Sequence, residues 1–323
     1  MLKEIGIMEV GGFRVGHAQD VQAATGCTVI LCDRMSPAGL DVRGGGPASR
    51  ESQILNPVAA AEGINAVLLS GGSAFGLDAA GGVQKYLEER DIGFDVGVTK
   101  VPLVSQSCLV VGSKDVRPTG AMAYEACENA SYEAPAEGNV GAGTGCSIGK
   151  YRGIARAMKS GFGTCAFQTG DLKVGALVAV NALGDVNGAD GEPMAGLLNQ
   201  EKTGLSNTLE EMFSDAEGKE NLFTGNTTLG VVVTNAAFHK TQLTKIAGMT
   251  HNGYARAIRP VHTTADGDSI YALSLGDVSG DLNLVGAMAA RAMEHAIRRA
   301  VYSAKSAYGL MGWDALPGKK ENG

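Results

Sequence analysis

The feature that most constrains this chain is its glycine content. The 323 residues include 47 glycines, about twice the share of roughly 7% that is usual in globular proteins. The glycines are scattered through apolar segments and follow no collagen-like period. They therefore predict tight turns and places where one stretch of backbone passes close to another.

Length and composition indicate an ordinary globular protein. Hydrophobic residues make up 44% of the chain and charged residues 19%, and a chain of this size buries roughly 75% of its unfolded surface. A net charge of −7 argues against nucleic acid or an anionic membrane as a partner. We see no signal peptide at the start of the chain and no run of 18 apolar residues. The expected location is the cytoplasm.

Cysteines and histidines give no metal-binding pattern. The cysteines include no CxxC pair and the histidines no HExxH motif, so we expect neither a metal nor a cofactor. We expect the cysteines to be reduced, partly buried small residues. The positions are Cys27, Cys32, Cys108, Cys127, Cys146 and Cys165, and His17, His239, His251, His262 and His295.

Apolar patterning predicts interspersed strands and helices. The predicted strands cover 27–32, 65–69, 163–168, 174–183, 229–234 and 269–275. The predicted helices cover 74–90, 117–130, 239–258 and 283–304. There is no clean βαβ period, internal repeat or linker, so we expect one α/β domain over residues 1–323.

Two glycine-rich motifs could suggest ligand binding. The segment 70–76 (SGGSAFG) could place an anion at a helix N-terminus, but it lacks a dinucleotide fingerprint, and Phe75 stands where a nucleophile elbow needs glycine. Close packing of strand on helix is the preferred interpretation. The run 141–145 (GAGTG) resembles a phosphate loop, but Lys150 is followed by Tyr151 and not by Ser or Thr. We therefore expect no nucleotide site.

A third motif has two interpretations. Asp266-Gly267-Asp268 lies between two predicted strands. By itself it is typical of a hairpin turn, because Asp-Gly readily supplies positive φ. It lacks the further ligands of an EF-hand loop.

The sharpest change in the sequence falls at position 226. Residues 199–225 are polar and without strong periodicity, which predicts an exposed connection. Then come Asn226, Thr227 and Thr228, followed at once by an apolar strand. A hydroxyl residue at such a junction suits an N-terminal nucleophile. Its hydroxyl attacks the preceding carbonyl, and the freed α-amine, with a pKa of about 7.7–8.0, can then accept the hydroxyl proton.

Several long strings resemble the self-processing aminopeptidases, a family that includes L-aminopeptidase/D-esterase, β-peptidyl aminopeptidases and the nylon-oligomer hydrolase. In order, they are LDVRGGGPASRE, NAVLLSGGSAFGLDAAGGVQKYLEER, EGNVGAGTG, VGALVAVNALGDV, NTTLGVVVTNA and ARAIRPVHTTADGDSIYALSLGD. Asn-Thr followed by Asp-Gly-Asp is nearer the nylon-hydrolase branch than the Gly-Ser peptidases.

The resemblance implies a fold and a processing event. The fold is a four-layer α/β/β/α sandwich, like that of N-terminal-nucleophile (Ntn) hydrolases but with different connectivity, and related to ornithine acetyltransferase. Cleavage would give an α-subunit of 1–226 and a β-subunit of 227–323. A symmetric oligomer, expected to be a tetramer of αβ units, would follow, and the Ala/Met-rich stretch 286–304 could supply apolar packing for it.

The resemblance also implies site residues. Thr227 matches the nucleophile and Asn181 the oxyanion-stabilising asparagine. Asp266 and Asp268 match the pair that orients the nucleophile and its amine. Lys150 matches a lysine of the nylon-hydrolase branch.

One segment departs from the pattern. Relatives often read VPIVP with an aromatic residue shortly after, which helps to form the oxyanion site. Here VPLVSQSCLVV places Ser105 at the second proline and Val110 near the aromatic position.

The leading hypothesis is a cofactor-free amide hydrolase of the aminopeptidase type that acts on short peptides or small amides. One alternative is an acyltransferase of the ornithine-acetyltransferase kind. The other is a non-catalytic relative that only binds a small ligand.

Overall fold

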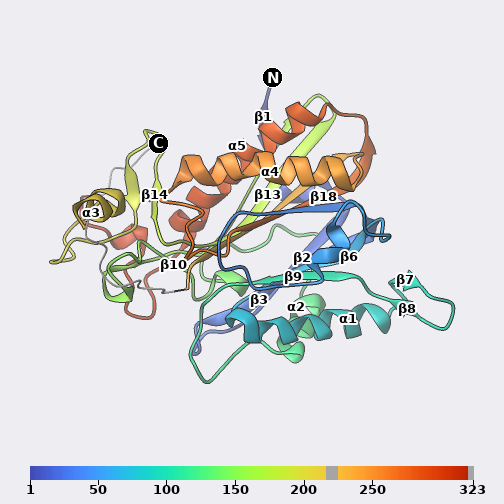
Figure 1. The fold of residues 1–323 in the computed structure, drawn as a ribbon, viewed down its shortest axis with the longest axis horizontal. Coiled ribbons are helices and arrows are strands. Elements are labelled where there is room, and N and C mark those ends of the chain that lie inside the picture. The colour runs from blue at the N-terminus through green and yellow to red at the C-terminus, as the bar shows by residue number, and fades with distance from the viewer. Residues whose placement is uncertain (216–224, 319–323) are drawn as a thin grey trace.

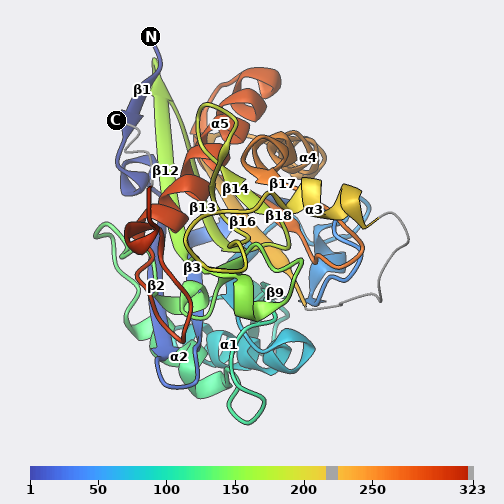
Figure 2. The same ribbon diagram turned by 90° about the vertical axis from the view of Figure 1, so that its left-hand side faces the viewer.

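Two β-sheets stack face to face, and a pair of helices covers each outer face (Figure 1). The computed structural model describes residues 1–215 and 225–318. Figure 2 shows the same order of layers from the side, with α4 and α5 at one extreme and α1 and α2 at the other. This arrangement confirms the predicted α/β/β/α sandwich.

The first sheet has six strands in the order β1, β12, β13, β16, β18, β4. Neighbours are antiparallel except β16 and β18, which run parallel. Because of this, β16 and β18 begin at the same edge of the sheet, and β13 ends there. The bounds are Lys3–Ile5 (β1), Ala38–Val42 (β4), Phe162–Thr169 (β12), Leu172–Asn181 (β13), Thr227–Ala236 (β16) and Ser269–Val278 (β18).

The second sheet has five strands in the order β2, β3, β6, β9, β5. Their bounds are Phe13–Asp20 (β2), Thr25–Ser36 (β3), Ser49–Arg50 (β5), Ile64–Ser70 (β6) and Val104–Cys108 (β9). Three small sheets complete the β-structure. They contain Phe94–Asp95 (β7) with Lys100–Val101 (β8), Ser147–Ile148 (β10) with Met158–Lys159 (β11), and Asp185–Asn187 (β14) with Pro193–Ala195 (β15) and Ile258–Arg259 (β17).

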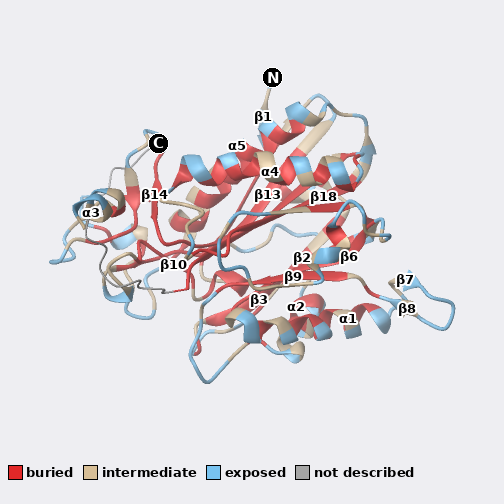
Figure 3. Ribbon diagram, in the orientation of Figure 1, coloured by how far each residue is buried: buried red, intermediate tan, exposed pale blue. Residues whose placement is uncertain are grey.

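Helices α4 and α5 cover the six-stranded sheet, and α1 and α2 cover the five-stranded sheet. Three apolar clusters fill the interfaces: one under α4 and α5, one between the sheets, and one under α1 and α2. Figure 3 shows most strands of the two large sheets buried and the outward faces of the helices exposed. The bounds are Ala80–Glu88 (α1), Gly120–Glu128 (α2), Thr208–Ser214 (α3), Lys240–Ala257 (α4) and Leu282–Ser303 (α5).

Glycines let helix backbones lie directly on the sheets, as the composition predicts. A Cβ on Gly163 of β12 would lie 2.4 Å from the Ala296 carbonyl oxygen of α5. A Cβ on Gly39 of β4 would lie 2.2 Å from the Thr244 amide nitrogen of α4. A side chain at either position would force the layers apart.

The predicted strands are confirmed, but five strands of the two main sheets were missed, namely β1, β2, β4, β5 and β9, as were the strands of the small sheets. The sequence of β9, VSQSC, is polar, although every residue is buried. The Gln106 amide donates to the Ser70 hydroxyl (2.8 Å) and to the Gly76 carbonyl (2.7 Å). Polar residues can occupy a core strand when such bonds satisfy them, and an apolar pattern cannot reveal that.

Three of the predicted helices are confirmed with slightly different ends, and the helix at 74–90 is partly wrong. Residues Ser73–Ala79 form a 3-10 helix, and α1 begins only at Ala80. A Cβ on Gly76 would lie 2.0 Å from the Gly71 carbonyl oxygen. This tight turn agrees with the packing role preferred for the motif. Gly145 of the GAGTG run is likewise packed against the Ala24 carbonyl oxygen.

The connection at 199–225 is not simply an exposed loop. It contains α3, whose N-cap Asn207 accepts bonds from the amides of Leu209 and Glu210. Glu211 of α3 forms ion pairs with Arg152 (2.6 Å) and Arg156 (2.9 Å). The N-cap and the acidic first turn were the available sequence signals. Residues 216–224 of the predicted connection lie outside the described residues.

Two further expectations can be compared with the structure. All six cysteines are free and buried, more fully than predicted. The Ala/Met-rich residues of 286–304 pack inside the chain under α5, so they do not supply the oligomer contact for which they were considered. In the part of the chain that the structure describes, no helix is long and apolar enough to cross a bilayer.

Candidate active site

The Asn226–Thr227 bond lies where β13 ends and β16 and β18 begin. Thr227 is the first residue of β16 and is paired with Asn181, the last residue of β13. Asn226 forms a bridge with Asp266, just before β18. Asn226 and Thr227 are only 1% and 2% exposed. The sheet topology therefore brings together Thr227, Asn181 and the Asp-Gly-Asp motif from distant parts of the sequence.

The Thr227 hydroxyl lies against the bond that precedes it. Thr227 Oγ1 donates to the Asn226 carbonyl oxygen, and the Gly267 amide donates to the same oxygen at 2.9 Å. A Cβ on Gly267 would lie 2.7 Å from Thr227 Oγ1. Any larger residue at position 267 would displace the hydroxyl.

Thr228 has a different environment. Its amide donates to Asp268 Oδ1 at 2.8 Å, and its carbonyl accepts a bond from the buried Tyr254 hydroxyl at 3.2 Å. Its own hydroxyl is buried with no hydrogen-bond partner among the described residues. Successive side chains of a strand point to opposite faces, which explains why only Thr227 contacts the Asn226 carbonyl.

Asn181 is held by Lys150 and Ser147. Lys150 Nζ donates to Asn181 Oδ1 (2.8 Å) and to the Asn181 carbonyl (3.0 Å), and the Ser147 amide donates to Oδ1 (3.1 Å). With three donors around these oxygens, the amide nitrogen Nδ2 must point the other way. It faces the carbonyl oxygens of Gly225 and Val110, each at 3.5 Å.

Lys150 is almost fully buried. Burial lowers the pKa of its ammonium to about 7, although the nearby Cys146, Asp266 and Asp268 favour the charged form. A substantial fraction of this lysine is therefore neutral at neutral pH. It contacts Asn181 rather than the threonine hydroxyl, so its visible role is to orient the asparagine amide.

Asp266 and Asp268 are not the turn of a hairpin, so that interpretation is wrong. The strand before them, β17, pairs with β14 and not with β18. Both aspartates are buried, at 1% and 0% exposure. Asp266 accepts bonds from the Thr263 amide (3.1 Å) and hydroxyl (2.5 Å). Burial first, and then the charge of Asp268, raise the pKa of Asp266.

The glycine loop 44–46 binds the backbone carbonyls of this motif. The amides of Arg43 and Gly44 donate to the Asp268 carbonyl (3.0 and 3.3 Å), and the Gly46 amide donates to the Asp266 carbonyl (2.8 Å). A Cβ on Gly44 would lie 2.3 Å from the Asp268 amide nitrogen. The loop therefore fixes Gly267 between two anchored neighbours.

His262 joins the site, although the histidines show no functional pattern in the sequence. Its Nδ1 lies 2.8 Å and its backbone amide 3.2 Å from Asp268 Oδ2. The ring also lies 4.7 Å from that of His251. His251 is a core histidine: it is fully buried, its Nε2 contacts the Asp41 carbonyl (3.1 Å), and burial lowers its pKa to about 4. Only the spacing of six residues between His262 and Asp268 hinted at this contact.

The segment that departs from the related sequences borders the site. Ser105 is buried and donates to the Glu51 carbonyl at 3.3 Å. Val110 lies against Gly225, the residue before Asn226, since a Cβ on Gly225 would meet its side chain at 2.5 Å. Val110 thus offers a carbonyl and a small side chain here. The backbone N–H that donates to the Asn226 carbonyl belongs to Gly267 instead. No pattern in the sequence indicates this donor.

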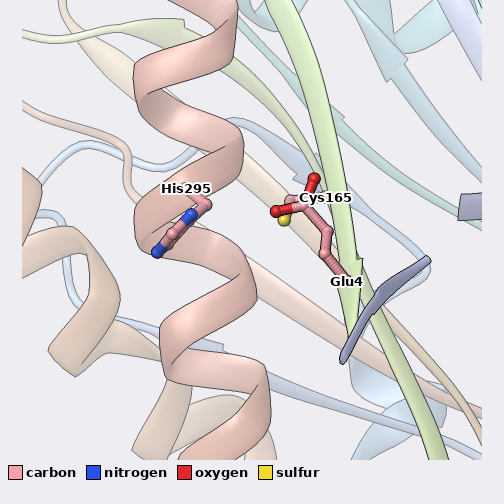
Figure 4. A group of neighbouring side chains, drawn as sticks. All are labelled: Glu4, Cys165 and His295. Atoms are coloured by element: carbon pink, nitrogen blue, oxygen red, sulfur yellow. The ribbon is translucent and has the colours of Figure 1, made fainter. Parts of the chain in front are cut away.

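One group of potential metal ligands occurs in residues 1–215 and 225–318. Glu4 of β1, Cys165 of β12 and His295 of α5 have ligand atoms within 4.8 Å of one another (Figure 4). Glu4 is already paired with Arg299. Burial raises the pKa of the Cys165 thiol to about 12, which disfavours the thiolate that a metal requires. The group therefore gives no support for a metal site.

The chain is similar to several known proteins. The sequence profile of Peptidase family S58 matches residues 6–314. An uncharacterized aminopeptidase of Mycobacterium leprae is 35% identical over 94% of this chain and 92% of its own length. A 6-aminohexanoate-oligomer endohydrolase of Agromyces sp. is 28% identical over 83% of this chain and 74% of its own length.

A solved structure shares the fold. The L-aminopeptidase D-Ala-esterase/amidase from Ochrobactrum anthropi, described as a variant of the Ntn hydrolase fold, superimposes with a TM-score of 0.67. The match covers 94% of this chain and 88% of that one at 17% identity. At this identity the likeness concerns the fold alone.

Proposed function

The chain belongs to Peptidase family S58 and is a hydrolase of amide bonds, and from that premise we propose how it acts. It cleaves itself between Asn226 and Thr227, and the freed Thr227 is the nucleophile for short peptides or small amides. The observation that carries this proposal is the hydrogen bond from Thr227 Oγ1 to the Asn226 carbonyl oxygen. The same oxygen also accepts a hydrogen bond from the Gly267 amide.

Self-cleavage needs only the chain and water. Thr227 Oγ1 bonds to the Asn226 carbonyl carbon, the bond from that carbon to the Thr227 nitrogen breaks, and the hydroxyl proton goes to that nitrogen. Water then hydrolyses the resulting ester. The products are the Asn226 carboxylate, a released proton, and a Thr227 that carries both a free α-amine and its hydroxyl.

Turnover repeats the chemistry on a substrate. The α-amine of Thr227 accepts the hydroxyl proton while Oγ1 attacks the substrate carbonyl. It then passes this proton to the substrate nitrogen, which leaves as an amine when the acyl-enzyme forms. Asn181 Nδ2 donates to the developing oxyanion. Water then releases the acid and restores Thr227.

The remaining site residues position these groups. Asp268 binds the Thr228 amide and so fixes the start of β16, while Asp266 anchors the loop that carries Gly267. Lys150 orients Asn181. The names of the similar proteins support an aminopeptidase or an oligoamide hydrolase as the type of activity.

We also propose that the mature protein is a homo-oligomer of αβ units, expected to be a tetramer, in the cytoplasm. The resemblance to the self-processing aminopeptidases supports the assembly, whereas the internal packing of α5 does not. Light scattering tests it, and a stable monomer at micromolar concentration would contradict it.

Activity of matched variants tests the function. The wild type should hydrolyse aminoacyl p-nitroanilides or short 6-aminohexanoate oligomers and should run as two fragments on a denaturing gel. Thr227→Ala should remain one inactive chain. Hydrolysis by folded Thr227→Ala at the wild-type rate would overturn the assignment of the nucleophile.

A further inference from the structure

Two adjacent carbonyls at the scissile junction bind two different donors. The Asn226 carbonyl, which belongs to the bond to be cut, accepts the Gly267 amide at 2.9 Å. The Gly225 carbonyl, one residue earlier, faces Asn181 Nδ2 at 3.5 Å. In the uncut chain, therefore, the asparagine assigned to turnover faces the carbonyl that precedes the scissile one.

The Asn181 amide cannot easily rotate to change this. Its Oδ1 accepts bonds from Lys150 Nζ and the Ser147 amide, so a flip would place the NH₂ group against two donors. Its Nδ2 is enclosed by the carbonyls of Gly225 and Val110. The Gly225 carbonyl thus occupies the Asn181 Nδ2 donor that a substrate carbonyl would need.

The Gly267 amide, in contrast, is fixed where the first reaction needs it. Its neighbours are anchored through their carbonyls, Asp266 by the Gly46 amide and Asp268 by the amides of Arg43 and Gly44. The distance of 2.9 Å to the Asn226 oxygen lies within the range of about 2.7–3.1 Å that oxyanion donors show. The absence of a side chain at 267 leaves room for Thr227 Oγ1.

We propose that the two reactions of this site use different oxyanion donors. The Gly267 amide stabilises the tetrahedral intermediate of self-cleavage, and Asn181 Nδ2 stays covered by the Gly225 carbonyl until cleavage releases it for substrate. The uncut chain is then an inactive precursor for a structural reason beyond its missing α-amine. This inference rests on the proposed function.

The first reaction follows from the contacts already described. As Thr227 Oγ1 bonds to the Asn226 carbonyl carbon, the carbonyl oxygen takes up the electron pair of the C=O π bond and becomes an oxyanion. The Gly267 N–H donates to it until the bond to the Thr227 nitrogen breaks and the carbonyl re-forms. Once the ester is hydrolysed, the end at Asn226 is no longer tied to β16, and the Gly225 carbonyl can leave Asn181.

Two changes separate the donors. Glycolic acid in place of Gly267, introduced by nonsense suppression in cell-free translation, converts that N–H to an ester oxygen. Glycolic acid in place of Gly188 is the matched control, because it removes a turn bond to the Glu192 carbonyl without touching the Asn226 carbonyl or the neighbours of Gly267. Asn181→Asp keeps the acceptor for Lys150 and Ser147 but loses the Nδ2 donor, and Asn181→Ala serves if that variant does not fold.

The expected result is a crossed pattern. Intact mass over time should show self-cleavage slowed by roughly 10²–10³-fold in the Gly267 ester, with much less change in the Gly188 ester. The matured fraction of the Gly267 ester should keep kcat for substrate within a few fold of wild type. Asn181→Asp should cleave itself within a few fold of wild type, but its kcat/KM should fall by roughly 10²–10³-fold.

Several outcomes would overturn the inference without touching the proposed function. Wild-type cleavage of the Gly267 ester would exclude that donor, and an uncut but folded Asn181→Asp would exclude the division of roles. Loss of both reactions in both variants would show a single shared oxyanion site. The proposed function is tested separately, because it fails if folded Thr227→Ala is cleaved or active.

Discussion

The two sides of Thr227 differ in which groups supply the hydrogen-bond donors. On the β13 side, defined by Ser147, Lys150 and Asn181, the side chains present donors, and one of them is a buried lysine. On the β18 side, defined by residues 262–268, two buried carboxylates accept bonds and a glycine amide donates. The β13 side depends on a side chain whose charge is costly to bury. The β18 side depends on backbone geometry that the glycine loop 44–46 fixes.

This difference predicts which measured property a substitution on each side will change. Changes on the β18 side should disturb the position of the nucleophile and show mainly in rate. Changes on the β13 side should also alter how stability depends on pH, because a lysine there has a strongly shifted pKa.

The largest effect is expected on the β18 side, from Asp268→Asn. Both Asp268 oxygens accept from N–H donors, Oδ1 from Thr228 and Oδ2 from His262. An asparagine must turn its NH₂ group toward one of these donors. We expect kcat to fall by roughly 10²-fold or more, measured by steady-state kinetics. The exposed Asp277→Asn is the control, and an unchanged kcat in folded Asp268→Asn would end the claim that the pair acts in catalysis.

The next effect belongs to the β13 side and concerns pH. Because the Lys150 pKa is lowered from 10.5 to about 7 in the folded chain, the unfolded state binds more protons between these values. The free energy of unfolding therefore rises with pH in that window, by up to roughly 1.4 kcal/mol per pH unit from this group. Urea unfolding of the uncut Thr227→Ala chain at pH 7, 8 and 9 measures the slope.

Adding Lys150→Met to that chain should reduce the slope by about this amount. The surface change Lys85→Met, on an exposed side chain, should leave it as it was. Equal slopes with and without Lys150 would show that the lysine is not buried in its neutral form.

A smaller effect is expected from His262→Asn. His262 has φ of 58°, a conformation that asparagine tolerates better than most residues. The substitution removes the ring contact with Asp268 and keeps the backbone one. We expect kcat to fall by about tenfold with little change in KM, as for loss of a single charge-assisted bond. His239→Asn, at an exposed position, is the control. If kcat of His262→Asn fell as far as that of Asp268→Asn, His262 would be more than a positioning residue.

The smallest effect should come from Thr228→Val, the neighbour of the nucleophile. The Thr228 hydroxyl has no hydrogen-bond partner among the residues described, and valine has nearly the same shape. Self-cleavage and kcat should stay within a few fold of wild type. Thermal stability should be unchanged or slightly higher, because a buried unpaired hydroxyl costs free energy. A loss of cleavage would show that Thr228 takes part in the reaction.

Several residues of the proposed site could be picked out from the sequence because they stand beside changes in pattern. Thr227 stands where a polar stretch meets an apolar strand, and Asn181 stands near the end of another. Bringing them together with Asp266 required the family resemblance, since pairing between β13, β16 and β18 cannot be read from local periodicity.

The features that were missed depend on backbone groups, long-range contacts or short elements, which a residue pattern does not reveal. The Gly267 amide is a backbone group and leaves no mark in a residue pattern. His262 acts through a contact set by the fold of its own loop, and the polar strand β9 is buried because Gln106 finds partners in other segments. Helix α3 is too short for periodicity, although its N-cap was visible.

The most direct test of the account is the mass of the purified protein and the amino-terminal sequence of its smaller fragment. The account predicts fragments of 226 and 97 residues, from the 323 of the whole chain (323 − 226 = 97), with the smaller beginning at Thr227. The same fragments should form in Thr228→Ala, and Thr227→Ala should give one chain. A fragment that begins at Thr228 would move the nucleophile by one residue, and a fully active enzyme that remains a single chain would contradict the mechanism.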